Sequence, residues 1–322
     1  MGVLRRVSGL VGALLALALV SAPRAAADTV AFTWADARIT APVGMATDTD
    51  HNMYWTTNAA AAKTSTTVYA VGSEGKVLAA ISYLRATTGP LAVAYDANRV
   101  FVLDKGTAAT AVRVSYITLS SVIVDGTVSY KSWDLTFPEA GQTAAALIVA
   151  PNTQLYVVAQ TGRVYKAPAT LATSGTNKLT KVSDGAGAVT GGYYDKRQKS
   201  VVLRTATSIV VADPTTFATV STVPAPAQTG GRGVAAAIDG ASYLLTANGN
   251  GNAVLSVPLT ASSASPSASL APSGSASAVP ATQPAAAAAI SGPEASQLVM
   301  YVALGAAALL GLVTAVIALV RR

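Results

Sequence analysis

Hydrophobic and polar residues alternate in short runs between residues 28 and 260, without a sustained helical period of 3.6 residues. β-Branched, aliphatic and aromatic runs end at Gly, Asn, Asp or Pro, which is typical of β-strands separated by turns. Five segments share a further order, in which a strand of small residues ends at a polar turn and a bulkier strand follows. They begin at Pro42, Pro90, Ala145, Gly191 and Val234. Three are followed by a further strand that ends in a turn or a proline, at Val68–Val71, Val164–Pro168 and Val254–Pro258.

The five segments recur at nearly regular intervals along the chain. Their turns are marked by Asp48, Asp96, Pro151, Asp195 and Asp239. The interval of about 43 to 55 residues is the length of one four-stranded blade of a β-propeller, so residues 28–260 predict about five blades. Six blades remain open if Val30–Trp34 and Val112–Trp133 each complete a sheet. A pair of β-sandwiches is the alternative, and the long regular interval disfavours it. We therefore predict an all-β fold, a β-propeller with small residues where its sheets converge.

The first residues of the chain have the order of a secretory signal peptide. Arg5 and Arg6 precede the apolar run Leu10–Val20, and Ala25–Ala27 provide small residues for cleavage. We expect residues 1–27 to be removed during export. The propeller, residues 28–260, is then outside the cytoplasm.

The other end of the chain predicts a membrane anchor and a stalk. Residues 297–320 are the expected transmembrane helix, because the 23 residues Leu298–Val320 carry no charge and can span about 30 Å of hydrocarbon. Residues 321–322, both Arg, form a cytoplasmic tail by the positive-inside rule. Residues 261–296 are rich in Ala, Ser and Pro and predict a disordered stalk. Small residues at every fourth position of the helix offer a surface for self-association: Ala303, Ala307, Gly311 and Ala315.

Composition and charge exclude several classes of function. The absence of cysteine rules out disulfides, thiolate metal sites and cysteine nucleophiles. The formal charge of +7 includes five arginines in the end segments, which leaves 17 cations against 15 acidic residues, about +2. We therefore expect no binding of nucleic acid, which needs a dense basic surface.

One motif has the spacing of a metal site. Asp48, Asp50 and Asn52 stand at alternate positions, as in the opening of a calcium-binding loop, and are the candidate metal ligands. An EF-hand continues with glycine and closes with glutamate, whereas Met53 and Ala59 stand at those positions. Because Asp recurs at the same place in other segments, the alternative is a turn that the Asp side chain stabilises.

The sequence predicts no catalytic residue and no cofactor other than this candidate calcium ion. His51 is the only histidine, and no Gly-x-Ser-x-Gly elbow accompanies it, so neither a serine triad nor a zinc site is expected. Catalysis by carboxylates alone needs two acids close together. The acids outside the turns are scattered through the chain: Asp104, Asp125, Asp134, Glu139, Asp184 and Asp213. Gly-rich segments such as Thr229–Gly233 lack the lysine of a phosphate-binding loop.

Several phrases resemble a group of exported, largely uncharacterised β-propeller proteins of actinobacteria. They cover most of Val30–Leu259 and are Asp36–Thr40 leading to Asp48, Tyr54–Asn58, Val68–Val71, and Val164–Pro168 followed by Thr173–Asn177. The resemblance implies acidic clusters at three places, where this chain has Gly89–Ala92, Lys105–Ala108 and Thr143–Ala146. Only Asp104 keeps a carboxylate nearby, which implies that any activity those acids serve has been lost.

These observations favour a membrane-tethered extracytoplasmic propeller that binds or scaffolds an envelope protein or glycan, without catalysis. The alternative function is a degenerate or metal-assisted hydrolase that uses loop carboxylates such as Asp48, Asp50 and Asp104. A third hypothesis is a structural surface protein without a specific ligand. Clustering of the carboxylates around a central channel would favour the hydrolase, and their dispersal over turns would favour binding.

Overall fold

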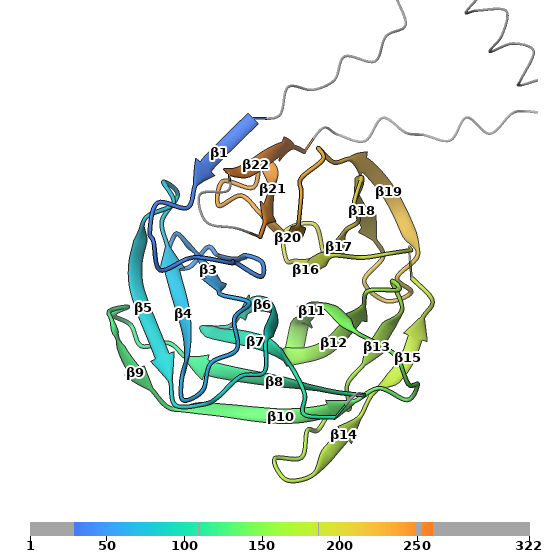
Figure 1. Cartoon of the computed structure of the whole chain (residues 1–322). Helices are drawn as coiled ribbons and strands as arrows, with labels where there is room; N and C mark the ends of the chain where they lie inside the picture. The colour runs from blue at the N-terminus through green and yellow to red at the C-terminus, as the bar shows by residue number, and fades with distance from the viewer. Residues whose placement is uncertain (1–28, 109, 186, 249–252, 260–322) are drawn as a thin grey trace, which may run out of the picture. The chain divides into compact units, whose positions relative to one another are not determined.

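The computed structural model describes residues 29–108, 110–185, 187–248 and 253–259. These residues form 22 β-strands and one short 3-10 helix, Pro151–Thr153. The strands build five sheets around a central axis (Figure 1). The fold is an all-β, five-bladed β-propeller, which confirms the predicted fold class.

Each blade takes most of its strands from one continuous stretch of chain. Blade 1 contains β2 (Ala46–Asp48), β3 (Met53–Thr57), β4 (Thr66–Val71), β5 (Val77–Tyr83) and β9 (Gly126–Val128). Blade 2 contains β6 (Pro90–Asp96), β7 (Arg99–Lys105), β8 (Ala111–Thr118), β10 (Tyr130–Thr136) and β14 (Thr176–Lys178). Blade 3 contains β11 (Ala144–Ala150), β12 (Gln154–Ala159), β13 (Val164–Lys166) and β15 (Thr180–Ser183).

The last two blades have four strands each. Blade 4 contains β16 (Gly191–Asp195), β17 (Ser200–Arg204), β18 (Ser208–Ala212) and β19 (Thr219–Pro224). Blade 5 contains β20 (Gly231–Ala236), β21 (Ser242–Ala247), β22 (Ala253–Pro258) and β1 (Thr29–Thr33). The five repeated segments of the sequence are the five inner hairpins, from β2–β3 to β20–β21, and the three predicted third strands are β4, β13 and β22.

The strand β1 closes the ring. It pairs antiparallel with β22, with Thr29 opposite Ser256 and Thr33 opposite Ala253, although the two strands come from opposite ends of the propeller sequence. The segment Val30–Trp34 therefore completes blade 5, and Val112–Trp133 supplies strands of blades 1 and 2. The open option of a sixth blade is wrong, because both segments join sheets that the other repeats already begin.

Two outer strands extend across the boundary between blades. β9 pairs parallel with β5 of blade 1, and the chain then continues into β10 of blade 2. β14 pairs parallel with β10 of blade 2 before the chain continues into β15 of blade 3. The buried Asn177 amide holds β14 in place, since its nitrogen donates to the carbonyl oxygens of Asp134 and Ala172, each at 3.1 Å. These crossings link blades 1, 2 and 3 by main-chain hydrogen bonds.

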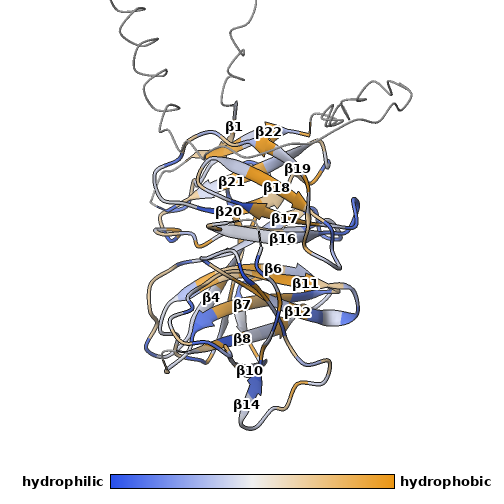
Figure 2. Cartoon of the chain, turned by 90° about the vertical axis from the view of Figure 1, so that its right-hand side faces the viewer, coloured by the Kyte–Doolittle hydropathy of each residue, from blue (hydrophilic) through white to orange (hydrophobic). Residues whose placement is uncertain are grey.

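Five hydrophobic clusters fill the spaces between neighbouring blades, one for each pair. In β7, Val100 and Val102 pack towards blade 1, while Phe101 and Leu103 pack towards blade 3. Successive side chains of a strand point to opposite faces of its sheet, so one central strand contributes to two clusters. Figure 2 shows the hydrophobic residues that β6, β11 and β18 carry as a result.

Near their beginnings, two pairs of neighbouring inner strands approach each other too closely for a side chain. A methyl group on Gly233 would lie 2.6 Å from Cα of Gly44 in the neighbouring blade, and one on Gly191 would lie 2.2 Å from the carbonyl oxygen of Arg232. Ala146 and Ala235 on the inner strands are completely buried. The expectation that small residues occupy the inner strands is confirmed.

The predicted signal peptide, stalk and transmembrane helix lie outside the described residues. Within the described ranges, no helix has the length and apolar character needed to cross a membrane. The topology predicted from residues 1–27 and 297–322 therefore stays a prediction.

Closure by β1 has a measurable energetic consequence. Phe32 is buried and packs edge-on against Trp34, with ring centroids 5.5 Å apart, and stacks on Tyr54 of blade 1 at 5.8 Å. We expect Phe32→Ala to lower the free energy of unfolding by about 3 kcal/mol, because it leaves a cavity between blades 5 and 1. Chemical denaturation of the full-length chain measures this. Val30→Ala is the matched control in the same strand, since Val30 is 52% exposed, and it should change stability by less than about 0.5 kcal/mol. Equal effects of the two substitutions would contradict this role of β1.

Candidate functional site

Two hollows lie at the two ends of the axis formed by the inner strands. The larger one, here called the entry cavity, lies where the inner strands begin and has a volume of about 630 Å³. Its size falls within the range of about 300 to 1,000 Å³ that is usual for ligand sites. Its lining comes from all five blades: Ala59, Gly89, Pro90, Leu91, Lys105, Thr143, Ala144, Ala145, Gln160, Ala188, Val189, Thr190, Gly230, Gly231, Arg232 and Asn248.

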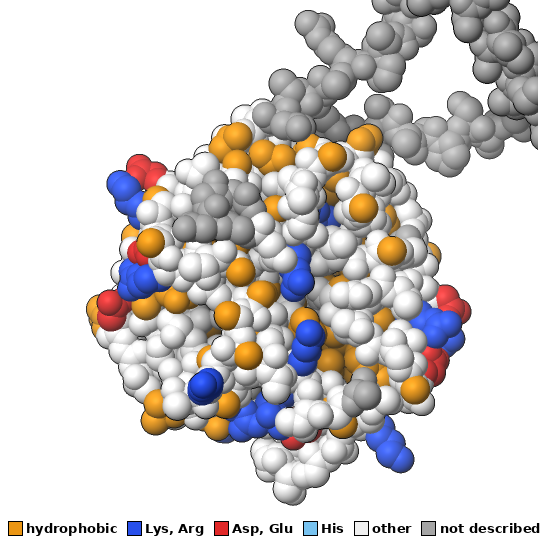
Figure 3. Space-filling model, in the orientation of Figure 1, with side chains coloured by type: hydrophobic (Ala, Val, Ile, Leu, Met, Phe, Trp, Pro, Cys, Tyr) orange, Lys and Arg blue, Asp and Glu red, His pale blue; other side chains and the backbone are white. Residues whose placement is uncertain are grey.

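The entry cavity carries positive charge. Lys105, at the end of β7, and Arg232, near the start of β20, are its charged residues, and no Asp or Glu is among the described residues that line it. Neither cation forms an ion pair with a carboxylate within the described ranges. Figure 3 shows this face, with Lys and Arg side chains near its centre and acidic side chains towards its edge. The polar lining is otherwise uncharged, from Thr and amide side chains.

Arg232 is oriented by a neighbour in the same blade. With the Asn248 amide turned so that its oxygen faces Arg232, the Arg232 Nε donates to that oxygen at 2.8 Å. The Asn248 nitrogen then donates to the carbonyl oxygen of Pro42 at 3.0 Å. The amide thus uses both of its ends to position the guanidinium group.

A third cation lies directly behind the cavity wall. Arg204 is 1% exposed, and a methyl group on the lining residue Gly231 would lie 2.4 Å from its Nη2. Its Nη1 donates to the carbonyl oxygens of Gly233 (3.0 Å) and Thr246 (2.5 Å), and its Nη2 donates to Gln228 Oε1 at 2.8 Å. These partners are neutral, and Nε has no hydrogen-bond partner among the described residues. Desolvation lowers the pKa of Arg204 to about 10, so the guanidinium remains charged at neutral pH.

The carboxylate next to Lys105 in the sequence is buried and accepts hydrogen bonds from backbone nitrogens. Asp104 is 3% exposed and accepts hydrogen bonds from Gly89 N at 2.8 Å and Thr88 N at 3.1 Å. Burial raises the pKa of Asp104 above its ordinary value. Asp104 therefore fixes the loop before β6, and its charge offsets only part of the positive charge around the cavity.

Three segments that the sequence analysis singled out meet at this place. Residues from Gly89–Ala92, Lys105–Ala108 and Thr143–Ala146 line the entry cavity or the groove beside it, which has a volume of about 260 Å³. These are the positions at which the resemblance implies acidic clusters. The chain instead presents a lysine, small residues and threonine there.

Sequence reasoning interpreted Thr229–Gly233 as a tight turn and missed Arg232 as a cavity residue. The repeats carry a signal for Lys105, Gln160 and Asn248, which stand at or just after the end of the second strand of their blades, whereas Arg232 stands near the start of the first strand of blade 5. In a propeller, equivalent positions of the repeats lie around the same axis. Comparing the five repeats position by position would have brought these side chains together.

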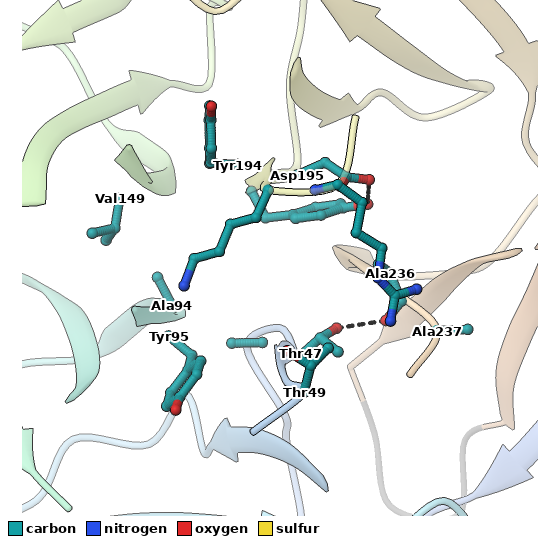
Figure 4. A pocket seen from close by; sticks show the side chains of 13 residues that line it. Thr47, Thr49, Ala94, Tyr95, Val149, Tyr194, Asp195, Ala236 and Ala237 are labelled. Atoms are coloured by element: carbon teal, nitrogen blue, oxygen red, sulfur yellow. Dashed lines mark hydrogen bonds between the residues drawn. The ribbon is translucent and has the colours of Figure 1, made fainter. Parts of the chain in front are cut away.

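The smaller hollow, here called the exit pocket, lies where the inner strands end. It has a volume of about 90 Å³, and Figure 4 shows its lining. Tyr95 donates through its hydroxyl to Asp50 Oδ2 at 2.9 Å, and Lys196 pairs with Asp96 at 2.8 Å beside the Tyr95 ring. Thr47 donates to the carbonyl oxygen of Ala236. Lys196 thus has a carboxylate partner at this end, whereas Lys105 and Arg232 of the entry cavity have none within the described ranges.

Asp48 stabilises the turn between β2 and β3. Its Oδ1 accepts hydrogen bonds from the backbone nitrogens of Asp50 and His51, each at 3.0 Å. Its Oδ2 contacts His51 Nδ1 at 2.8 Å and accepts from Trp55 Nε1 at 3.0 Å. The side chain is completely buried, and all four acceptor positions of the carboxylate are used. Asp195 and Asp239 accept from backbone nitrogens in the same way, which confirms the role of these residues in turns.

The calcium site at Asp48, Asp50 and Asn52 stays a prediction. A calcium ion on Asp48 would replace at least one of its four hydrogen bonds, whereas Asn52 is exposed and Asp50 faces Tyr95 through Oδ2. Within the described ranges, no group of three His, Asp or Glu residues is arranged to hold a metal ion. His51 contacts Asp48 and no hydroxyl nucleophile among the described residues.

The remaining acids have local structural partners. Asp125 accepts from Ala80 N at 2.7 Å, which fixes the segment before β9. Asp213 accepts from Thr215 N and Thr216 N within its own turn. The others form ion pairs: Asp134 with Arg113 (2.6 Å), Glu139 with Arg163 (2.6 Å) and Asp184 with Lys181 (2.9 Å).

Comparison with known proteins gives a likeness of fold. The chain is similar to the solved structure of a gluconolactonase from Xanthomonas campestris, at 11% identity and a TM-score of 0.42, over 69% of this chain and 86% of that one. It is also similar to glutaminyl cyclase from Myxococcus xanthus, at 9% identity and a TM-score of 0.45, over 71% and 94% of the two chains. No family model and no curated protein sequence matches the chain. At such low identity the likeness concerns the fold and says nothing about substrate.

The hydrogen bonds of the buried Asp48 carboxylate predict that an isosteric substitution lowers the stability of the protein substantially. Asp48→Asn keeps the shape but places an amide nitrogen against donors such as Trp55 Nε1, so we expect a loss of about 2 to 3 kcal/mol in unfolding free energy. Asp239→Asn is the control, because Asp239 accepts a single hydrogen bond of 2.8 Å, from Ala241 N, in an exposed turn. Urea denaturation followed by tryptophan fluorescence measures both. A loss for Asp48→Asn no larger than for Asp239→Asn would show that the buried bonds do not stabilise the turn.

The calcium prediction is best tested through Asp50, because changes at Asp48 destabilise the turn by themselves. Calcium at a hundredfold excess over its Kd should stabilise the protein by about 2.7 kcal/mol, and a chelator should remove this gain. Asp50→Asn should abolish the gain while leaving the bonds of Asp48 in place. Differential scanning calorimetry with calcium and with chelator is the measurement. The same Tm in both conditions for the unaltered protein would refute the calcium site.

Proposed function

We propose that the chain is a non-catalytic binding module of the cell envelope that holds its ligand in the entry cavity. The observation that carries this proposal is the composition of the cavity wall. All five blades supply it with backbone groups, threonines, amides and two cations, but with no carboxylate or imidazole among the described lining residues. Such a wall can form hydrogen bonds to a polar ligand, whereas it lacks the imidazole and carboxylate groups that serve most often as general acid or base.

The positions of the carboxylates argue against the alternative, a hydrolase. Asp48 follows an inner strand at the exit end, and Asp50 lies in the same turn. Asp104 pairs with Pro90 at the beginning of β6, and therefore lies at the entry end. Because the inner strands run in the same direction around the axis, Asp104 is separated from Asp48 and Asp50 by the length of a strand, and the Asp48 carboxylate is occupied by its four contacts in the turn. Paired carboxylate catalysis needs a much shorter separation, about 5 to 9.5 Å.

The resemblance to exported propellers of actinobacteria agrees with a change from chemistry to binding. It implies acidic clusters at three segments, and this chain carries Lys105 and small residues there. Within this proposal, the sites that would hold a cation or a substrate in such relatives have become the wall of a binding cavity.

The proposal includes the topology predicted from the ends of the chain. Residues 1–27 direct export, and residues 297–320 tether the protein to the cell membrane, so the propeller faces an envelope protein or glycan. The helix stripe at Gly311 adds self-association as part of the same proposal. A tethered domain of this kind meets ligands that are themselves held in the envelope, so a modest affinity is sufficient.

An occluding substitution tests the proposal. Ala188 is exposed and lines the entry cavity, so Ala188→Phe should block ligand access without loss of stability. Ala218→Phe is the matched control, because Ala218 is equally exposed in an outer turn of blade 4. The full-length chain is applied to an array of bacterial glycans and envelope fractions. We expect binding to at least one component, lost in Ala188→Phe, kept in Ala218→Phe, and without cleavage of the bound component by mass spectrometry.

Two results would contradict this function. Binding that is equal in both variants would place the ligand elsewhere on the molecule. Turnover of the bound component that Ala188→Phe abolishes would show an enzyme.

A further inference from the structure

We propose that the ligand of the entry cavity is an acidic saccharide, whose carboxylate or phosphate group is bound by Arg232 and Lys105. This inference rests on the proposed binding function and adds the chemical class of the ligand.

The first argument is the unbalanced charge of the cavity. Lys105 and Arg232 line it, and neither has a carboxylate partner among the described residues. Elsewhere in the described chain, cations such as Arg113, Arg163 and Lys196 are paired with acids at 2.6 to 2.8 Å. Two unpaired cations on a concave wall attract an anion more strongly than they would on a convex surface, because the cavity focuses their field.

The second argument is the buried guanidinium group behind the wall. Burying a charge without a counter-charge is costly, and a cation of this kind is normally paired. Arg204 is 1% exposed, bonds only to neutral oxygens, and keeps an unpartnered Nε, while its Nη2 lies against Gly231 of the cavity wall. An anion in the cavity would supply the missing counter-charge, since only the backbone of Gly231 separates the cavity from the Arg204 guanidinium group.

Asp104 does not provide that counter-charge. It is the acid nearest to Lys105 in the sequence, but its carboxylate is buried, accepts from Thr88 N and Gly89 N, and forms no ion pair with Lys105. Its burial also raises its pKa, which disfavours the negative form. The cations therefore outnumber the acids around the cavity by three to one.

The uncharged part of the wall favours a saccharide as the carrier of the anion. Thr143, Thr190 and Gln160 offer hydroxyl and amide groups that match sugar hydroxyls, and the apolar contacts come from small residues. No aromatic residue is among the described lining residues, so the site lacks a surface on which a nucleobase would stack.

The groove beside the cavity gives room for a chain of sugars. It shares Lys105, Thr143 and Ala144 with the cavity and continues along Gly106, Thr107 and Gln142, with a volume of about 260 Å³. Lys105 lies at the junction of the two spaces. An extended ligand can therefore place one acidic unit near Arg232 and continue past Lys105 along the groove, towards Thr107 and Gln142.

Isothermal titration calorimetry of the full-length chain in detergent tests the inference. The probes are trigalacturonic acid and mannose 6-phosphate, which present a carboxylate and a phosphate, with trigalactose and mannose as their neutral counterparts. We expect at least one acidic probe to bind at least tenfold more tightly than its neutral counterpart. The affinity for this probe should fall as the salt concentration rises. The acidic probe that binds identifies the oxyanion.

Charge-neutralising variants locate the site. Arg232→Gln and Lys105→Gln should each lower the affinity for the acidic probe about tenfold or more, since each removes a charged hydrogen-bond donor. Lys131→Gln is the control, because Lys131 is exposed on β10 and forms no ion pair within the described residues, and it should change affinity less than twofold. Both test positions are at least partly exposed, so folding should be unaffected, and the Tm of each variant verifies this.

The outcomes separate this inference from the proposed function. Equal affinity for acidic and neutral probes, with binding still lost in Ala188→Phe, overturns the acidic ligand and keeps the binding module. Tight binding of an acidic probe that neither Arg232→Gln nor Lys105→Gln weakens also overturns the inference. Absence of binding to every acidic probe overturns the inference, and absence of binding at this cavity to every glycan and envelope fraction as well overturns both.

Discussion

The pairing of β1 with β22 is the constraint on which the remaining structure depends. The five hydrophobic clusters lie between blades, so every blade needs a neighbour on each side to bury its two faces. Only a closed ring meets this requirement for blades 1 and 5. Closure uses the first and the last strands of the described chain, and the contact order is correspondingly high. The entry cavity exists because the ring is closed, since its wall includes residues of every blade.

The architecture could be predicted because each inner hairpin has a local sequence pattern, in which a strand of small residues, a polar turn and a bulkier strand follow one another. Phrases such as Ala92–Asp96 followed by Val100–Val102 indicate both a hairpin and its inner position, and five copies favour five blades, although the pairing of β1 with β22 was needed to exclude a sixth. The outer strands could not be derived in this way. β9 and β14 are three residues long and pair with a blade other than the one that the chain enters next, so only tertiary packing decides their partners. Asn177 of β14 illustrates this, because its amide donates to the carbonyl oxygen of Asp134 in β10, which is 43 residues away in the sequence.

The candidate site was harder to predict than the fold, for a physical reason. The turn at Asp48 attracts attention because its acids are close in sequence, yet its carboxylate is fully used in holding the turn. Lys105 and Arg232 are far apart in sequence and each follows or begins a strand, so neither forms a motif. A cavity on the axis of a propeller collects single residues from many repeats, and sequence spacing does not record that convergence. The small residues that convergence requires also leave the wall with few side chains, so the charges at the strand ends dominate its character.

The place of β22 in its sheet also determines how the propeller responds to mechanical load. β22 lies between β1 and β21 and is hydrogen-bonded to both strands. Directly after β22, the Leu259 nitrogen donates to the carbonyl oxygen of Ala241, which precedes β21. A force applied at Leu259 along the axis of β22 shears this strand against β1 and β21. The hydrogen bonds of both ladders then share the load, whereas a force at right angles to the strand would break them one at a time. The fifth blade therefore resists such a force with two ladders at once, and a force that overcame them would open the ring and disrupt the entry cavity in the same event.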